Sequence, residues 1–155
     1  RLASQGNINP KLLKNLLNHK YFKIDPPKST GFETFNAKWL QSCLSKLKTI
    51  NKIDVLSTLT YFTIITVANE VNRFNPKSEQ IYFCGGGSHN QLLVRGILSL
   101  SNKLRYTNIH PGVDEKNIES LSFAWLSMVR IKSQKITNTT ITGSKKARLL
   151  GTIYR

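Results

Sequence analysis

The positions of apolar residues along the chain predict mainly helices, because apolar side chains recur every three or four residues over several segments. These segments are 12–17, 35–47, 55–71, 92–100 and 118–128. Two shorter runs, 81–84 and 105–109, are rich in residues that favour strands. We therefore expect an α/β domain that is helix-rich and has a small sheet. Trp39, Phe123 and Trp125 lie at helical spacing with other apolar residues and are expected to anchor the core.

Polar residues stand where several of these helices should begin. Their side chains can accept hydrogen bonds from the free N–H groups of a helix's first turn. Thr30 and Ser88 are each followed three residues later by Glu or Gln, which is the spacing of a capping box. The predicted caps are Asn9, Thr30, Asp54, Ser88 and Asp114.

The sequence around the first predicted strand is its most distinctive part. The run 81–84 has the makeup of a buried strand, and Gly85, Gly86 and Gly87 follow it directly, ahead of a helix. Such a turn lets the backbone approach a ligand closely and directs free N–H groups at an anion or polar group. A tight turn without a ligand explains the same residues equally well. The run matches neither GxGxxG nor GxxxxGK[ST].

Composition and charge limit the function classes. A chain of 155 residues with 39% hydrophobic residues fits one globular domain. The net charge of +15 suggests an anionic partner. The basic residues are dispersed along the chain, however, which is more typical of a solvated surface than of a nucleic-acid interface.

Cysteine and histidine usage gives no sign of a disulfide framework or a metal site. Cys43 and Cys84 both lie in apolar surroundings and are expected to be reduced core residues, which favours a cytoplasmic setting. The three histidines are far apart and lack ligand spacing, so no metal site is predicted. The chain opens without an apolar leader, and 55–71 contains too many polar residues for a membrane span.

Five segments resemble motifs of the anhydro-N-acetylmuramic acid kinases. Residues 28–40 resemble PPKSTGRExFNxxWL, residues 84–93 resemble CGGGxxNxxL, and residues 119–126 resemble EAxAFAWLA. Residues 142–143 and 150–154 resemble the C-terminal VTGA…LGxIY. The segments follow the family's order and together extend over essentially the whole chain.

The resemblance implies one domain of the actin-like ATPase (ribonuclease H-like) fold of the sugar kinase/Hsp70/actin superfamily, in which two α/β domains close on a cleft. Residues 1–155 would be a single domain, the C-terminal, nucleotide-side half of the kinase, and 1–30 would link it to an N-terminal domain. The family uses ATP and Mg²⁺ to phosphorylate the 6-hydroxyl of 1,6-anhydro-N-acetylmuramic acid. Water opens the anhydro bridge in the same reaction, which serves cell-wall recycling.

The resemblance also implies roles for particular residues. The three glycines and Asn90 would form the wall that holds the adenosine part of ATP. Glu119 would support catalysis by orienting the attacking group or the Mg²⁺ shell, although the helix dipole alone also favours a first-turn glutamate. Ser29, Thr30 and Gly31 would lie beside the interdomain cleft, or would serve only as a capping loop.

The chain also departs from the family pattern. Phe32 stands where the family has an arginine, and the segments 108–118 and 139–144 are altered. The family's phosphate loop and catalytic aspartate are missing from this sequence, so we expect the chain alone to be inactive without an N-terminal kinase domain. A homodimer is left open.

Three alternatives to the kinase half stay open. The chain could be a non-catalytic remnant or interaction domain of the same fold, or a basic nucleic-acid binder. The levoglucosan kinases share similar motifs, so the sugar is not fixed by these residues.

Overall fold

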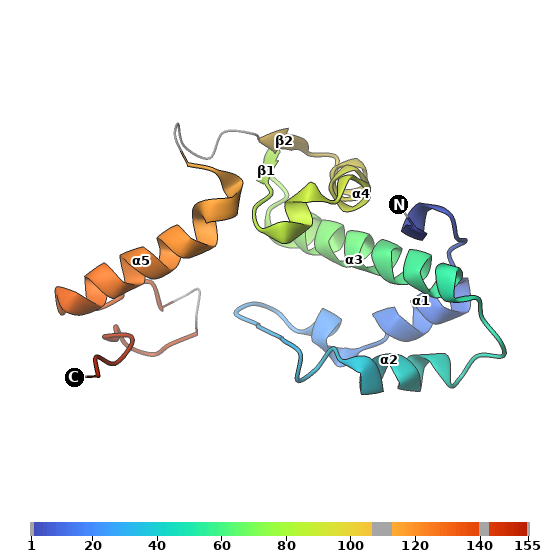
Figure 1. Ribbon diagram of the computed structural model, residues 1–155, viewed down its shortest axis with the longest axis horizontal. Coiled ribbons are helices and arrows are strands. Elements are labelled where there is room, and N and C mark those ends of the chain that lie inside the picture. Colours follow the sequence, from blue (N-terminus) through green and yellow to red (C-terminus); the bar gives the residue numbers. More distant parts are fainter. Residues whose placement is uncertain (1, 107–112, 140–142, 155) are drawn as a thin grey trace.

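The computed structural model describes residues 2–106, 113–139 and 143–154, and over them the chain is mainly helical (Figure 1). Five α-helices and two short strands follow one another along the chain, joined by short 3₁₀ helices that are labelled η. The elements are η1 (Leu2–Ser4), α1 (Pro10–Leu17), η2 (Lys20–Lys23), α2 (Ala37–Leu44), α3 (Lys52–Phe74), β1 (Gln80–Tyr82), η3 (Gly86–His89), α4 (Gln91–Ser101), β2 (Leu104–Tyr106), η4 (Glu115–Asn117) and α5 (Ile118–Ile131).

Asparagine side chains cap the first four α-helices. The Asn9 side chain accepts a hydrogen bond from the Leu12 N–H at 3.0 Å, as predicted. Equivalent caps stand at the starts of α2, α3 and α4. The capping residues are Asn9, Asn36, Asn51 and Asn90.

The other predicted caps are wrong or cap a different element. Thr30 lies well ahead of α2, because a turn in which Gly31 O accepts two N–H groups intervenes. Asp54 lies inside the first turn of α3 and accepts from the Asn7 N–H at 2.7 Å, while Ser88 turns back to Gly85 O. Asp114 caps η4, which leads into α5.

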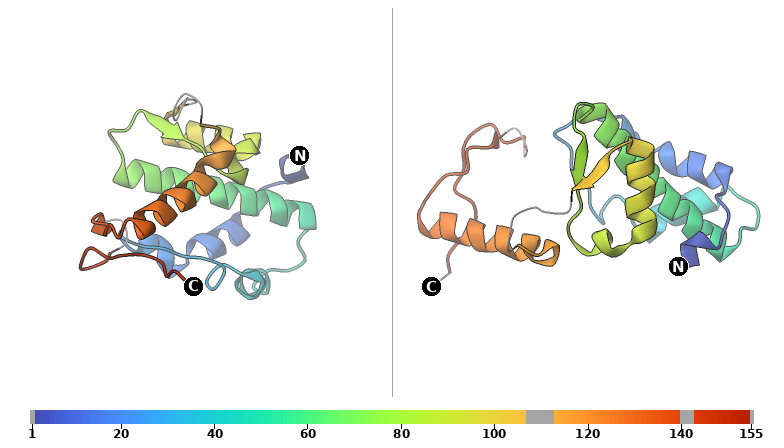
Figure 2. Two further views of the ribbon diagram at one scale, coloured as in Figure 1. Left: turned by 60° about the vertical axis from the view of Figure 1, so that its left-hand side comes forward. Right: turned by 90° about the horizontal axis from the view of Figure 1, so that it is seen from above.

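The core forms on both sides of α3, the longest helix. On one side lie α1 and α2, where the buried Leu12, Leu16 and Cys43 pack with Trp39 and Phe62. The expectations that Cys43 is buried and that Trp39 belongs to the core are confirmed. On the other side lies α4 (Figures 1 and 2).

Helices α3 and α4 cross closely at Gly96. A Cβ atom added to Gly96 would lie 2.6 Å from Cδ1 and 2.9 Å from Cγ2 of Ile64, a side chain that is 5% exposed. Val94 and Ile97 are buried in the same contact. The absence of a side chain at position 96 therefore sets how near the two helices lie.

The two strands form a parallel pair joined by η3 and α4. Gln80, Ile81 and Tyr82 of β1 pair with Leu104, Arg105 and Tyr106 of β2, respectively. The strand at 81–84 was expected to be buried, and this is wrong, because Tyr82 is 49% exposed and Cys84 is exposed. A parallel sheet buries its strands only when neighbouring strands and helices cover them. In the described part of the chain, this sheet has two strands.

Helix α5 lies to one side of the group formed by α1–α4 (Figures 1 and 2). Phe123 is 63% exposed and Trp125 is 50% exposed, so the expectation that they anchor the core is wrong. The segment that follows α5 folds back, and Ile136 and Arg148 form an antiparallel bridge. The second predicted strand corresponds to β2, although its part at 107–109 lies outside the described residues.

A membrane span is not found among the helices of the described segments, since none combines sufficient length with sufficient hydrophobicity. This includes α3, which contains the apolar stretch 55–71.

The close crossing gives a stability prediction. Gly96→Val should lower the free energy of unfolding by about 2 kcal/mol, because the added branches overlap Ile64 and force the two helices apart. Urea denaturation followed by circular dichroism measures this change. Ser99→Val, at an exposed position of the same helix, should change stability by less than about 0.5 kcal/mol. Equal stability of the two variants would contradict the close crossing.

Candidate functional site

The three glycines form an exposed turn with open space above it. Gly85 has φ 75°, which favours glycine, and its carbonyl oxygen accepts from the Ser88 N–H at 3.1 Å and the Ser88 hydroxyl at 2.7 Å. A Cβ atom added to Gly85, Gly86 or Gly87 would meet no atom within 4 Å. The buried Ser88 thus stabilises the inner side of the turn through its hydrogen bonds to Gly85, and the outer side of the turn is exposed backbone without side chains.

Asn90 joins this turn to α4. Its side-chain oxygen accepts from the N–H groups of Leu92 at 3.1 Å and Leu93 at 3.4 Å. Its amide nitrogen has no hydrogen-bond partner among the residues that the structure describes. The capping role therefore occupies the oxygen and leaves an exposed donor beside the glycines.

The loop that contains Ser29, Thr30 and Gly31 is attached to the C-terminal end of α3. Lys28 Nζ forms an ion pair with Glu70 Oε2 at 2.9 Å and lies 4.8 Å from the centre of the Tyr21 ring. Its side chain is only 9% exposed. A second ion pair joins Asp25 of the loop to Arg73 of α3.

Lys28 therefore has a structural role that the sequence did not predict, since the segment was expected to be a cleft loop or a capping loop. The exposed residues Ser29, Thr30 and Gly31 are the part of the loop that is available to a ligand or partner. The sequence shows a lysine in the loop and a glutamate near the end of the long helix. Nothing in the sequence indicated that the two would meet.

Glu119 lies in the first turn of α5 and is exposed. In Figures 1 and 2 the N-terminal end of α5 is directed toward η3, and the glycine turn, the 29–31 loop and this helix end lie on the same side of α1–α4. Over the described segments, no hydrogen bond or ion pair joins Glu119 to the glycines or to the loop. The structure thus places the predicted groups on one side without linking them directly.

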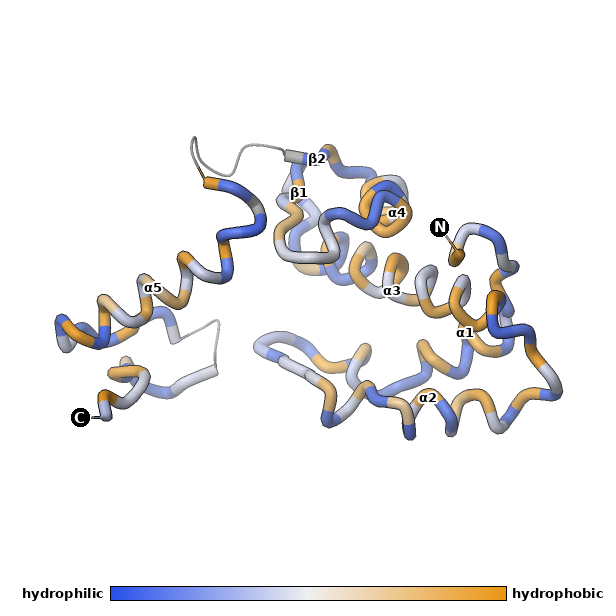
Figure 3. The backbone as a smooth tube through the Cα atoms, viewed as in Figure 1, coloured by the Kyte–Doolittle hydropathy of each residue, from blue (hydrophilic) through white to orange (hydrophobic). Residues whose placement is uncertain are grey.

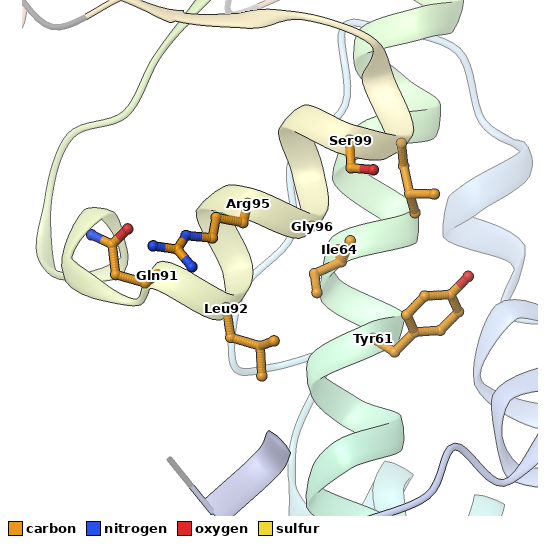
Figure 4. A pocket seen from close by; sticks show the side chains of 8 residues that line it. Tyr61, Ile64, Gln91, Leu92, Arg95, Gly96 and Ser99 are labelled. Atoms are coloured by element: carbon orange, nitrogen blue, oxygen red, sulfur yellow. The ribbon is translucent and has the colours of Figure 1, made fainter. Parts of the chain in front are cut away.

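A groove beside the glycine turn was not predicted. It has a volume of about 490 Å³ between α3 and α4. Its lining includes Tyr61, Ile64, Gln91, Leu92, Arg95 and Ser99. Figure 4 shows the guanidinium group of Arg95 extending toward Gln91 at the end of α4 that follows the turn. Their separation of four residues on one helix was a sequence signal for such a pair.

The described residues offer few ligands for a metal ion. In the residues that the structure describes, no group of three or more His, Cys, Asp or Glu side chains could hold a metal ion. Glu119 is a single carboxylate, whereas Mg²⁺ is usually held by one or two carboxylates together with phosphate oxygens and waters. Within the described segments, Glu119 would therefore need phosphate oxygens and waters to complete a Mg²⁺ coordination shell.

The sequence over residues 1–155 matches the family model described as anhydro-N-acetylmuramic acid kinase. This chain belongs to that family. The family inferred from the motifs is thereby confirmed, whereas the placement of the chain in the C-terminal half of such an enzyme stays a prediction.

Relatives named anhydro-N-acetylmuramic acid kinase show the same relationship. The protein of Shewanella frigidimarina is 36% identical over 150 residues, which are 96% of this chain and 40% of the relative. That of Pseudomonas syringae is 34% identical over 153 residues, which are 98% of this chain and 42% of the relative. That of Saccharophagus degradans is 38% identical over 154 residues, which are 98% of this chain and 41% of the relative. The chain thus spans about two fifths of the length of these relatives.

The ion pair of Lys28 gives a second stability prediction. Lys28→Met should lower the free energy of unfolding by about 1–3 kcal/mol, because it leaves the partly buried Glu70 without its counter-charge. Lys23→Met, at an exposed lysine of η2, should have almost no effect. Guanidinium denaturation of both variants makes the comparison. If the two variants unfold at the same midpoint, Lys28 does not anchor the loop.

Proposed function

We propose that this chain is the nucleotide-side half of an anhydro-N-acetylmuramic acid kinase with an actin-like ATPase fold. The complete enzyme would be an ATP-dependent, cytoplasmic phosphotransferase that acts on the 6-hydroxyl of 1,6-anhydro-N-acetylmuramic acid and opens its anhydro bridge. The observation that carries the proposal is the open glycine turn, above which a side chain would meet no atom within 4 Å. The membership of the chain in this kinase family supports the reaction class.

The glycine turn is suited to hold adenosine. A flat ring can lie directly against the backbone of Gly86 and Gly87, because no side chain keeps it away. The free amide of Asn90 can donate to a ring nitrogen or a ribose hydroxyl at the edge of the turn. Arg95, one helical turn into α4, adds a positive charge on the same side as Gln91.

The remaining groups would serve the reaction at the cleft. ATP supplies the phosphoryl group, and Mg²⁺ neutralises charge that develops on it. Glu119 would orient the attacking hydroxyl or water, and the 29–31 loop, held by Lys28 and Glu70, would form part of the cleft wall. The donors around the transferred phosphate and the catalytic base would come from an N-terminal kinase domain.

The sheet agrees with the view that the chain is part of a larger fold. Two parallel strands joined by a helix form a unit that normally belongs to a wider sheet covered by helices on both faces. The exposed Tyr82 and Leu104 of these strands would then be covered in the complete enzyme.

Nucleotide binding by the isolated chain tests whether the glycine turn holds adenosine. Gly86→Leu should weaken MgATP binding by about tenfold or more, because the new side chain occupies the space where the ring would lie. The fold should persist, since the added atoms have open space and Gly86 does not need a positive φ. Isothermal titration calorimetry measures the affinity. Ala37→Leu, an exposed position at the start of α2, is the control. Absence of MgATP binding by the unaltered chain would reject the glycine turn as the adenosine site.

The role of Glu119 is tested in an assembled enzyme. The chain alone should transfer no phosphate, and activity should appear when the part of the Shewanella frigidimarina relative left uncovered by the match is supplied. Glu119→Gln should then lower kcat by about a hundredfold, because the amide cannot accept a proton or orient the nucleophile as a carboxylate does. Release of ADP with 1,6-anhydro-N-acetylmuramic acid as substrate gives the rate. Glu79→Gln is the matched control, and equal rates for both variants would remove Glu119 from the reaction.

One observation favours a second candidate, a non-catalytic interaction domain of the same fold. Phe32 is 82% exposed at the position where the family motif carries an arginine, so the loop presents an apolar ring in place of a cation. Normal turnover by the assembled enzyme would exclude this candidate.

A further inference from the structure

Helix α5 has the composition of a buried helix and the exposure of a surface helix. Val129 is its buried residue, although apolar side chains occur on several of its faces. A helix that is apolar almost all round is normally enclosed by other elements. Figure 3 shows the apolar positions distributed along the whole of α5, away from the helices around α3. The exposed ones are Leu121 (53%), Phe123 (63%), Trp125 (50%), Met128 (41%) and Ile131 (74%).

The segment after α5 extends this apolar surface. A cavity of about 520 Å³ opens between the helix and the stretch 150–153. Leu150 is 46% exposed and Ile153 is 53% exposed. We call the surface formed by this cavity and the exposed side of the helix the α5 face. Its lining residues from the two segments are Phe123, Leu126, Ile131, Leu150 and Ile153, with Arg130 as the charged member.

We propose that the α5 face is the docking surface for the part of the kinase fold that this chain lacks. The inference rests on the function proposed above and assigns the surface by which the two parts associate. The occupant is the polypeptide that corresponds to about three fifths of the relatives' length, which the match leaves uncovered. Because the cavity is lined mainly by apolar side chains and by Arg130, this occupant would place apolar side chains in the cavity and a hydrogen-bond acceptor beside Arg130.

The size of the uncovered part supports this occupant. Contiguous apolar surface of this kind in a globular protein marks a binding surface. Helices α1 and α4 pack against α3, whereas the contacts of α5 are mainly with η4, the 3₁₀ helix directly before it. In the Shewanella frigidimarina relative, the part that the match leaves uncovered is longer than this chain, so it is large enough to cover α5.

Charge complementarity distinguishes this occupant from a second copy of the chain. Over residues 118–155 the sequence contains a single acidic residue, Glu119, and many basic ones. The basic residues are Arg130, Lys132, Lys135, Lys145, Lys146, Arg148 and Arg155. An isologous dimer through the α5 face would bring two segments of the same strongly basic sequence together, which is unfavourable. The occupant therefore carries apolar side chains together with acidic residues that complement the basic segment 118–155.

Co-expression tests the assignment. The tagged 155-residue chain is produced together with the part of the Shewanella frigidimarina relative left uncovered by the match, and the complex is measured by size-exclusion chromatography with light scattering. Ile131→Glu and, as a second variant, Phe123→Glu should weaken association by about tenfold or more, since each places a charge in the apolar face. Both positions are exposed in the chain, so both variants should keep its melting temperature.

Leu2→Glu is the matched control. Leu2 is 61% exposed in η1, which lies on the far side of the molecule from α5 (Figures 1 and 2). The proposal requires a one-to-one complex with the unaltered chain and with Leu2→Glu, and its loss in the two α5 variants.

Three results would overturn it. The first is association that Ile131→Glu and Phe123→Glu leave unchanged. The second is a dimer of the chain alone that these variants dissolve, which would assign the face to a second copy. The third is no soluble complex with the unaltered chain. MgATP binding by the chain alone is measured in parallel. Failure to associate while nucleotide binding is retained would overturn the docking surface alone, whereas failure to bind nucleotide would count against the proposed function.

Discussion

The close contact between α3 and α4 is the constraint on which the arrangement of the candidate site depends. The missing side chain at Gly96 lets the two helices approach until Ile64 fills the space between them. Helix α4 is joined to η3 by the cap at Asn90, so the position of α4 also fixes the position of the glycine turn. The same long helix holds the 29–31 loop at its other face through Glu70 and Lys28. A single helix thereby positions two of the three predicted cleft groups.

Local signals in the sequence were sufficient for much of the helical structure. The apolar spacing located α1 and α3, and the asparagine before Pro10 was correctly expected to cap the first helix. Competing caps could not be ranked, because Thr30, Asp54 and Ser88 have suitable side chains but the chain makes other hydrogen bonds there. Which polar residue caps a helix depends on where the preceding turn ends, and short-range spacing does not determine that.

Burial was harder to predict, because periodicity indicates an apolar surface without naming what covers it. The run at 81–84 has a strand composition, yet β1 has a neighbour on one side in the described sheet, and Tyr82 and Cys84 are exposed. Phe123 and Trp125 were expected in a core, but among the described residues they are 63% and 50% exposed on α5. The glycines were expected to let a ligand approach the backbone closely, and the space beside them is open, because the absence of side chains is a local property that tertiary packing did not alter.

The exposed apolar surface of α5 also has a consequence for how long the chain persists in a cell. Exposed apolar side chains are what chaperones and proteases bind when they sort incompletely assembled proteins. A copy of this chain whose α5 remains uncovered would be retained or degraded, whereas a copy with α5 covered would persist.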